Sequence, residues 1–509
     1  MRRAMPEEPE EEAKPKRAAR GIPEAEPEES QELPTDSGEE FADEMEITMV
    51  RRMALNLDDP VPIAKPPSFS DPARAIRSEP TQPDREPLDK KWLAICAAIP
   101  VGVLLFGLLV ALVGAVSPRD PAKVAAASGL SRTCTPMVGV DSQLFAVANE
   151  GEIELRELAA DEPQTVSNPY QGPITKPARL STVNKTASAS GGIYGAVDEH
   201  SYWSQCVSPL TDSVAIAPGT EGTTLVLYNP DNEPVYVDIT ISTSSGQADA
   251  PDLRGMQIGG YSTQLIKLSD YATDEEQAGV RVRTITGRLG VSIASKTETG
   301  MSVSSASRLS KKILIPGAPA GADTSRLVVT NPDTTRKELT VRVVDAEGTK
   351  TVEEKLVAEA QRTQSFDLKK YLDKGAAIEI TSDYEIAASL ISSAGSDLAV
   401  SQGSDDYGSD HLIGTAATAG TLLLANLTDQ DTTAHVSWDG EETADIQLKA
   451  GTSTSIAVPS GKKNLEVRAE QQIAGAIFLT ETGISVANLS HFAQPKNIEV
   501  LPDPGVARG

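Results

Sequence analysis

The sequence is poor in the residue types that build catalytic and metal-binding sites. Its 509 residues include only three cysteines, four histidines and three tryptophans, and aromatic residues make up 4% of the chain. None of the histidines stands in a His-Glu-x-x-His pattern, so a zincin-type metal site is not indicated. A hydrophobic share of 39% is thin for one large enzyme and typical of small β domains joined to a disordered segment.

Signatures of nucleophilic catalysis are also missing. Ser409 stands close to His411, but no Gly-x-Ser-x-Gly elbow surrounds it, and triad members normally come from separate loops. The acidic pair Asp405-Asp406 matches no EF-hand spacing, and a solvated loop explains it. We therefore expect a protein that is not an enzyme, with no catalytic residue, no cofactor and no metal site.

The charge balance argues against nucleic acid as a partner. The formal net charge is −27 at pH 7. Binding to phosphate backbones needs clustered Lys and Arg, and a strongly acidic surface repels them. Nucleic-acid binding is therefore set aside.

Residues 1–91 form an acidic segment rich in Pro and Glu, which cannot bury enough apolar surface to offset the entropy of ordering. We expect this segment to be a disordered cytoplasmic tail. One stretch near 39–57 differs, because apolar residues recur there every four positions, with acids before and bases near its end. This docking stripe consists of Phe41, Met45, Met49, Met53 and Leu57. It predicts either a helix that docks on a cytoplasmic partner or a transient helix without one.

Residues 92–116 carry no charge and are long enough to cross a bilayer as one helix. Lys90 and Lys91 lie directly before this run, and fewer basic residues follow it. The positive-inside rule then places the N-terminus in the cytoplasm and the C-terminal part outside the cell membrane. A cleaved signal peptide is the rival interpretation, but the segment before the apolar run is far longer than a signal n-region. We predict a single-pass transmembrane helix.

The cysteines divide between the two sides of this predicted anchor. Cys96 lies in the apolar run, where a thiol acts as a small hydrophobic group. If the C-terminal side is extracytoplasmic, Cys134 and Cys206 are a natural disulfide pair, and the alternative is two unpaired thiols. Trp203 lies near Cys206, and either packs against the disulfide or stacks on a ligand.

The C-terminal part contains an internal repeat of about a hundred residues. Three apolar stretches end at Asn229, Asn331 and Asn426, and the first two continue as Asn-Pro-Asp. Alternating apolar and polar residues follow each Asn, which predicts a strand with one face in a core. The Asn-Pro sequence between such strands is typical of a turn.

The repeats predict a mostly β fold, with tandem immunoglobulin-like β-sandwich modules after one transmembrane helix and a disordered N-terminal tail. We expect a linker at 117–130, a divergent β module at 131–206 and a C-terminal tail at 501–509. The three sandwich modules are expected at 207–305, 306–405 and 406–500.

The motifs together resemble an actinobacterial family of membrane-anchored proteins of unknown function. Three features carry this resemblance over residues 92–500. They are the single transmembrane helix, the segment from Tyr202 to Cys206 and the repeated turn with Asn and Pro. The third copy departs from the pattern, because Leu427 follows Asn426, which leaves the form of its turn open. The resemblance implies a cell-envelope protein and transfers no catalytic residue.

Three functions are compatible with these features. The first is a non-enzymatic membrane protein whose ectodomain binds or scaffolds an envelope protein or polysaccharide. The second is a signal transducer that uses the docking stripe near 39–57. The third is an envelope glycan-acting enzyme, for which the sequence marks no site.

Overall fold

A computed structural model describes residues 122–125, 131–492 except 274, 299 and 462, and 497–500. These residues all belong to the second of two compact units of the chain, Leu105–Gly509. The described part is mostly β, as predicted, and its only helical elements are the 3-10 turns η2 (Pro251–Leu253), η3 (Leu268–Asp270) and η4 (Lys369–Tyr371). None of the described residues forms a helix with the length and apolarity that a membrane crossing requires.

The first module forms two four-stranded antiparallel sheets with a shared core. One sheet has the order β2-β7-β4-β5 and the other β6-β3-β8-β9. The strands are β2 (Arg132–Cys134), β3 (Ser142–Ala148), β4 (Ile153–Glu157), β5 (Gln164–Val166), β6 (Tyr170–Ile174), β7 (Ala178–Thr182), β8 (Ala189–Val197) and β9 (His200–Gln205).

The second module repeats this strand order, with sheets β10-β15-β12-β13 and β14-β11-β16-β17 around one apolar core. Its strands are β10 (Asp212–Ala217), β11 (Thr223–Tyr228), β12 (Val235–Ser242), β13 (Met256–Ile258), β14 (Thr263–Lys267), β15 (Ala278–Thr286), β16 (Gly290–Thr297) and β17 (Gly300–Ser305). The alternation predicted after Asn229 is visible in β12, where Val237, Ile239 and Ile241 point into the core.

In the third and fourth modules the sixth and seventh strands fuse into one long strand, β24 or β31, which runs through both sheets. The third module consists of β18 (Ser310–Ala318), β19 (Thr324–Asn331), β20 (Lys337–Asp345), β21 (Gly348–Thr351), β22 (Leu356–Ala358), β23 (Arg362–Asp367), β24 (Ala376–Ala394) and β25 (Asp397–Gln402). The fourth consists of β26 (Ser409–Thr415), β27 (Gly420–Asn426), β28 (Thr432–Trp438), β29 (Glu441–Leu448), β30 (Ser453–Ala457), β31 (Asn464–Leu479) and β32 (Ser485–Asn488).

The strand order differs from that of an immunoglobulin domain at the sheet edges. The pairs of second with fifth and third with sixth strand are those of the immunoglobulin sandwich. In that fold the first strand lies beside the second, whereas here β10 lies beside the sixth strand β15, and the seventh strand β16 lies beside β11. Short strand patterns reveal the number and period of strands but not which edge each one joins.

The repeated Asn has the same structural role in all three copies. Asn229 and Asn331 are fully buried, and each Nδ2 donates to a backbone carbonyl four residues later, that of Glu233 at 2.7 Å and that of Thr335 at 2.8 Å. Asn426 makes the matching bond to the carbonyl of Gln430 at 2.7 Å. The third turn therefore keeps the same form although it lacks the Pro, because the side-chain amide of the Asn, and not the proline ring, holds the turn.

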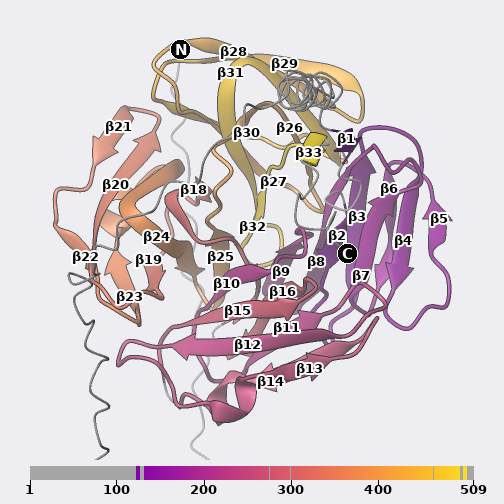
Figure 1. The fold of residues 1–509 in the computed structure, drawn as a ribbon. Helices are drawn as coiled ribbons and strands as arrows, with labels where there is room; N and C mark the ends of the chain where they lie inside the picture. Colours follow the sequence, from indigo (N-terminus) through magenta and orange to yellow (C-terminus); the bar gives the residue numbers. More distant parts are fainter. Residues whose placement is uncertain are drawn as a thin grey trace, which may run out of the picture. The chain divides into compact units, whose positions relative to one another are not determined.

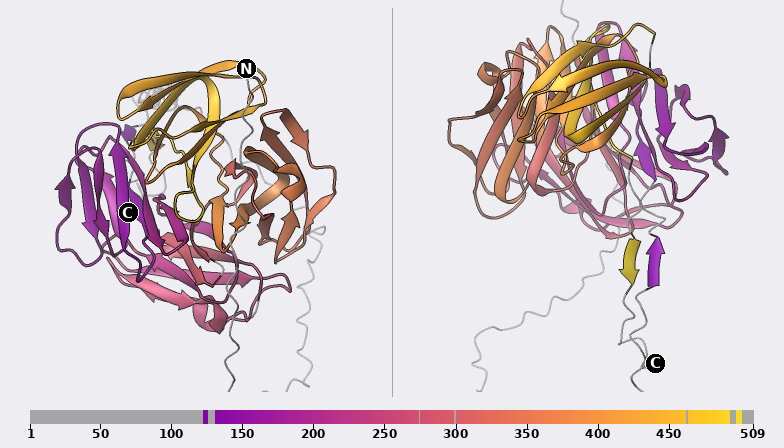
Figure 2. Two further views of the ribbon diagram at one scale, coloured as in Figure 1. Left: turned by 180° about the vertical axis from the view of Figure 1, so that it is seen from behind. Right: turned by 90° about the horizontal axis from the view of Figure 1, so that it is seen from above.

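Four apolar clusters join the modules in a propeller-like arrangement around a common centre (Figures 1 and 2). The clusters place Leu144 with Met301, Val214 with Val328, Ala377 with Ala474, and Trp203 with Leu412. The last of them joins the fourth module to the first. A Val, Leu or Met side chain buried in this way contributes about 1.5–3 kcal/mol, and an Ala contributes less, so closure of the ring is itself a source of stability.

Two short strands lie at the ends of the described unit. β1 (Ala122–Ala125) falls within the stretch expected to be the linker 117–130, and it pairs antiparallel with β33 (Asn497–Val500). Figure 2 shows this pair as a separate two-stranded ribbon. Four residues are too few to carry a recognisable strand pattern, so β1 could not be predicted from the sequence.

Candidate functional site

The last strands of the four modules meet at the centre of the arrangement. β9 lies beside β17, β17 beside β25, β25 beside β32, and β32 beside β9. Just after each last strand, one residue forms a backbone bridge to the first strand of the same module. The bridged pairs are Thr133 with Val207, Val214 with Ser307, Leu314 with Ser404, and Ile413 with Ser490. These bridges define equivalent positions in the four modules.

A cavity of about 360 Å³ opens where these strands end. The residues four before each bridge line it, namely Trp203, Val303, Val400 and Val486. So do the residues two before each bridge, namely Gln205, Ser305, Gln402 and Asn488. All four modules thus contribute matching side chains to one cavity, whose volume is within the usual range for small-ligand sites.

Hydrogen bonds between the modules hold the polar part of this lining in place. Ser304 Oγ donates to Gln402 Oε1 at 2.9 Å, and Gln402 Nε2 donates to Ser307 Oγ at 3.0 Å. Asn488 Nδ2 donates to the Gln402 carbonyl at 3.1 Å, and Ser305 Oγ donates to the Gln205 carbonyl at 2.8 Å. These amide groups are therefore largely satisfied within the protein.

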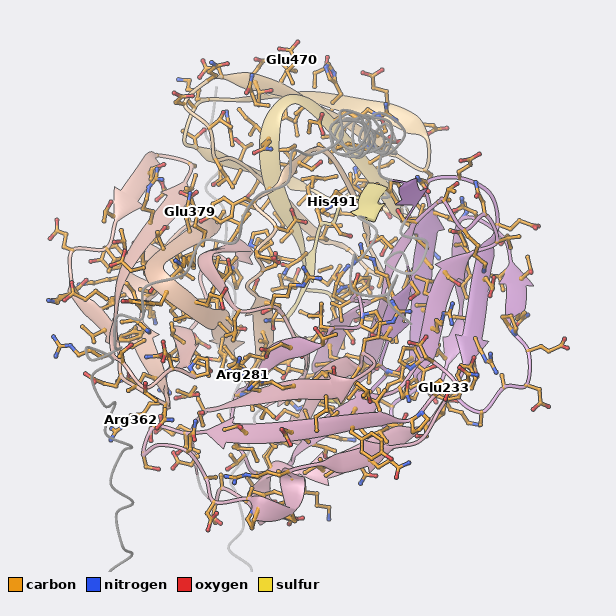
Figure 3. All side chains as sticks on the ribbon, in the orientation of Figure 1. Glu233, Arg281, Arg362, Glu379, Glu470 and His491 are labelled. Carbon is orange, nitrogen blue, oxygen red and sulfur yellow. A yellow bond between two sulfur atoms is a disulfide. The ribbon has the colours of Figure 1, made fainter. Side chains whose placement is uncertain are left out.

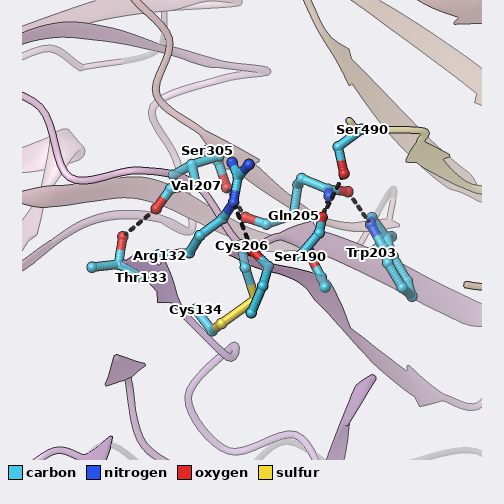
Figure 4. Close-up of a disulfide and its surroundings, with 12 residues drawn as sticks. Arg132, Thr133, Cys134, Ser190, Trp203, Gln205, Cys206, Val207, Ser305 and Ser490 are labelled. Atoms are coloured by element: carbon cyan, nitrogen blue, oxygen red, sulfur yellow. Dashed lines mark hydrogen bonds between the residues drawn. A yellow bond between two sulfur atoms is a disulfide. The ribbon is translucent and has the colours of Figure 1, made fainter. Parts of the chain in front are cut away.

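Arg132 reaches the cavity from β2 (Figure 4). Its Nε donates to the carbonyl of Ala189 at 3.1 Å, and among the described residues neither Nη1 nor Nη2 has a hydrogen-bond acceptor. Burial lowers the pKa of the Arg132 guanidinium, and the Asp406 carboxylate partly opposes this shift. The side chain stays charged because its ordinary pKa is so high.

The disulfide holds the backbone of β2 next to Arg132. The structure joins Cys134 to Cys206, with their Cα atoms 4.4 Å apart. Next to it, Thr133 N donates to the Val207 carbonyl at 2.7 Å, and Thr133 Oγ1 donates to the same oxygen at 3.1 Å. The short strand β2 is thereby tied to the end of β9 by covalent and hydrogen bonds (Figure 4).

Charged residues of both signs surround the mouth. Asp405, Asp406 and Arg308 are exposed and border the cavity. His491, labelled in Figure 3, lies with its Nδ1 2.6 Å from Asp406 Oδ2, so part of the acidic charge is already engaged. The Asp405-Asp406 pair, expected to be a solvated loop, is thus exposed but borders a cavity.

The opposite ends of the last strands meet at one carboxylate. Asp397 Oδ2 accepts hydrogen bonds from the backbone N–H groups of Ser201 at 3.1 Å and Ile484 at 2.8 Å. Asp397 Oδ1 accepts from Met301 N at 3.2 Å. A Cβ at Gly483, whose φ is +66°, would overlap this carboxylate, which explains the glycine. One buried side chain of the third module therefore contacts the other three.

Comparison with known protein families identifies the family of this chain. Residues 181–459, more than half of the chain, match a family described as a family of unknown function, DUF5719. The chain belongs to the DUF5719 family. A comparison with curated proteins found no match.

The family assignment confirms the expectation of a family of unknown function. In this DUF5719 protein the matched residues begin in β7 and end just after β30. They include Cys206, Asp397 and Gln402, whereas Arg132 and Cys134 precede them. Arg132 therefore lies outside the matched segment, whereas Arg308, Asp405 and Asp406 lie within it.

Trp203 does not share the apolar cluster of the disulfide, which was one of the two alternatives considered for it. It is 6% exposed and belongs to the apolar cluster shared with the fourth module, not to the cluster that contains both cysteines. Its ring lies 6.3 Å from that of Phe145, and its Nε1 donates to Gln205 Oε1 at 2.9 Å. It packs at the junction of the first and fourth modules and also borders the cavity.

Two other groups of residues in the DUF5719 protein could suggest a catalytic or a metal site, and neither has the geometry or setting of one. Ser409 Oγ accepts from the backbone N–H of His411 at 3.1 Å, which is not the contact of a nucleophile with a base. His435, Glu442 and Asp445 offer ligand atoms within 4.8 Å of one another on an exposed surface of the fourth module. Exposed acidic groups of this kind are common without a metal, so we assign none.

Several predicted features lie outside the described residues. They are the tail 1–91 with its docking stripe Phe41, Met45, Met49, Met53 and Leu57, the helix 92–116 and the tail 501–509. They remain predictions for this DUF5719 protein.

Sequence reasoning missed Arg132 and Asp397, which stand out only when the ends of the modules are aligned. Asp397 occupies the position of His200, Gly300 and Gly483 in the other modules. Aligning the last strands of the repeats would have shown this departure, but the inexact first module hid the fourfold pattern.

Proposed function

We propose that this protein is a non-enzymatic, single-pass membrane protein of the cell envelope whose β ectodomain binds an envelope component. The observation that carries the proposal is the central cavity, to which all four modules contribute equivalent side chains. A chain of independent spacer modules has no need for such convergence. A ring that encloses a lined cavity is suited to holding a ligand.

The membrane anchor in this proposal rests on the sequence. The uncharged stretch 92–116 and the preceding Lys90 and Lys91 support a cytoplasmic N-terminus and an extracytoplasmic β unit. The bond between Cys134 and Cys206 supports the same orientation, because disulfides persist in oxidising compartments.

The finer fold assignment is also a proposal. We regard the modules as relatives of the immunoglobulin sandwich in which the two edge strands have exchanged sheets. The support is the shared central pairing, of β11 with β14 and of β12 with β15.

The absence of enzymatic activity is supported by how the lining is bonded. The amides of Gln402 and Asn488 are hydrogen-bonded to other residues of the ring. A glycan-acting enzyme would need two carboxylates facing each other across a bound sugar. Here Asp406 pairs with His491 at the mouth. The transducer alternative depends on the docking stripe near 39–57 and predicts a cytoplasmic partner for it.

Two measurements test the proposal. Protease treatment of intact cells that carry tags at Met1 and Gly509 should remove the C-terminal tag and spare the N-terminal one. The reverse pattern would refute the envelope location.

The second measurement is native mass spectrometry of the full chain released from membranes. We expect a bound small molecule that is absent from Ser208→Trp, a variant that fills the cavity from a half-buried lining position. A matched Trp substitution at the exposed Ile285, outside the cavity, should retain the molecule. If no molecule accompanies the wild-type protein or if both variants keep it, the cavity is not the binding site.

A further inference from the structure

Arg132 breaks the fourfold pattern of the ring. It directly precedes Thr133, the bridge residue of the first module. At the equivalent position the other modules carry Ser213, Ile313 and Leu412, which are all buried and uncharged. A charge at a position that is otherwise small or apolar costs free energy of desolvation, so packing does not account for it.

The guanidinium of Arg132 is held by one hydrogen bond, and part of its hydrogen-bonding capacity is unused within the protein. Its Nε is bound to the Ala189 carbonyl, which leaves the Nη1 and Nη2 edge without an acceptor among the described residues. No carboxylate forms an ion pair with Arg132 in that part of the chain, and Asp406, whose charge it senses, is engaged by His491. The free edge of a guanidinium matches the two oxygens of a carboxylate.

The walls next to Arg132 are mainly apolar. They include Val207, Leu210, Val303, Val400, Leu412 and Leu489. The amides of Gln402 and Asn488 are occupied by bonds between the modules and are therefore less available to a highly hydroxylated molecule. Asp405 and Asp406 also border the cavity, where the positive charge of Arg308 offsets part of theirs. The acidic charge of the rest of the protein is screened by salt over about 8 Å and does not cancel a direct contact.

We propose that the cavity binds a small organic carboxylate with a compact apolar body, whose carboxylate pairs with Arg132. This inference rests on the proposed function of the cavity and specifies its ligand. The apolar body lies against Val303, Val400 and Leu412, and displaces water from them. The disulfide between Cys134 and Cys206 keeps the guanidinium in place for this contact.

The test uses matched probes and the full chain in lipid nanodiscs. Calorimetric titration compares 4-methylpentanoate with 4-methylpentanamide, which has the same shape but no charge. We expect the acid to bind at least about tenfold more tightly than the amide, as charge-assisted hydrogen bonds imply. Equal affinity of the two probes would overturn the role given to the carboxylate.

Variants then assign the contact to one residue. Arg132→Gln should weaken binding of the acid by at least about tenfold and leave the amide unchanged, whereas Arg132→Lys should fall between. Arg362→Gln is the matched control, because Arg362 is an exposed arginine outside the cavity lining and should leave binding of the acid unchanged. If Arg132→Gln binds the acid like wild type while its unfolding midpoint is retained, the proposal is wrong.

The source of the ligand is resolved by a further probe. N-acetyl-leucine, which mimics a peptide C-terminus, binds better than 4-methylpentanoate if the natural carboxylate ends a peptide, and worse if it is a free acid. If the native protein carries a molecule that Ser208→Trp loses but no carboxylate displaces it, this inference fails and the proposed function stands. If neither a native molecule nor any probe binds, both fail.

Discussion

The carboxylate of Asp397 accepts a hydrogen bond from the backbone N–H of Ser201 at 3.1 Å, across 196 residues of sequence. The same side chain also accepts from Met301 and Ile484, so one residue of the third module is bonded to the first, second and fourth. Hydrogen bonds to a buried charge contribute more than neutral ones, and this carboxylate receives three. Asp397 thus links the four modules through its hydrogen bonds, and we call it the clasp of the ring.

Removing that clasp should loosen the whole unit. Asp397→Ala leaves three N–H groups without their acceptor in a buried place, so we expect a loss of about 3–5 kcal/mol in the free energy of unfolding. Asp397→Asn should cost less, because one oxygen remains. Urea denaturation of the full chain measures both, with the exposed Asp383→Ala as the control. A clasp variant as stable as that control would contradict the role.

The disulfide should stabilise the first module through the unfolded state. Cys134 and Cys206 are 72 residues apart, a loop for which the chain-entropy account gives about 4 kcal/mol. We expect Cys134→Ala/Cys206→Ala and the reduced wild type to lose similar stability in chemical denaturation. Mass mapping of protein from intact cells should find the bond, and two free thiols there would refute it.

The repeated Asn should be sensitive to truncation. Asn229 Nδ2 donates to the carbonyls of Glu233 at 2.7 Å and Gly259 at 3.0 Å, and its Oδ1 accepts from Asp231 N at 3.1 Å. Asn229→Ala leaves these buried groups unpaired and should cost about 2–4 kcal/mol. Asn232→Ala, an exposed change in the same turn, should cost less than about 0.5 kcal/mol. Equal effects in thermal unfolding would show that the bonds matter little.

Glu379 should make stability fall as pH rises. Burial raises the pKa of Glu379 above its ordinary value of 4.5, although Arg342 Nη1 lies 3.0 Å from its Oε2 and acts in the opposite direction, as does Lys312. Because the folded state holds this proton more tightly than the unfolded state, stability is lost between the unfolded and the folded pKa. The window therefore starts near pH 4.5 and extends upward.

Glu379→Gln should flatten this part of the stability profile, because an amide has no proton to lose over this pH range. Unfolding free energies measured from pH 4.5 to 8 provide the comparison, and Glu353→Gln, at an exposed position, is the control. An unchanged slope in Glu379→Gln would mean that Arg342 fully offsets the burial of the carboxylate.

How far sequence reasoning reached depends on the range of each signal. The sequence predicted the alternation in β12 and the turn at the Asn that precedes it, because strand periodicity and turn chemistry are local properties. The edge position of β10 could not be predicted, because its pairing with β15 joins residues about seventy positions apart and leaves no local pattern. The first module was hardest to recognise, because its third strand follows Asn149, which is exposed and lacks the buried bonds of the other three asparagines.

The sequence by itself determined that this protein is mostly β and that its modules repeat around a shared Asn at a turn. Those properties follow from composition, local period and turn chemistry. Only the tertiary structure decided that the modules close into a ring, that Asp397 clasps it and that Arg132 faces a common cavity. Ring closure depends on side chains hundreds of residues apart, such as Ser190 and Ser490, whose contact no local pattern encodes.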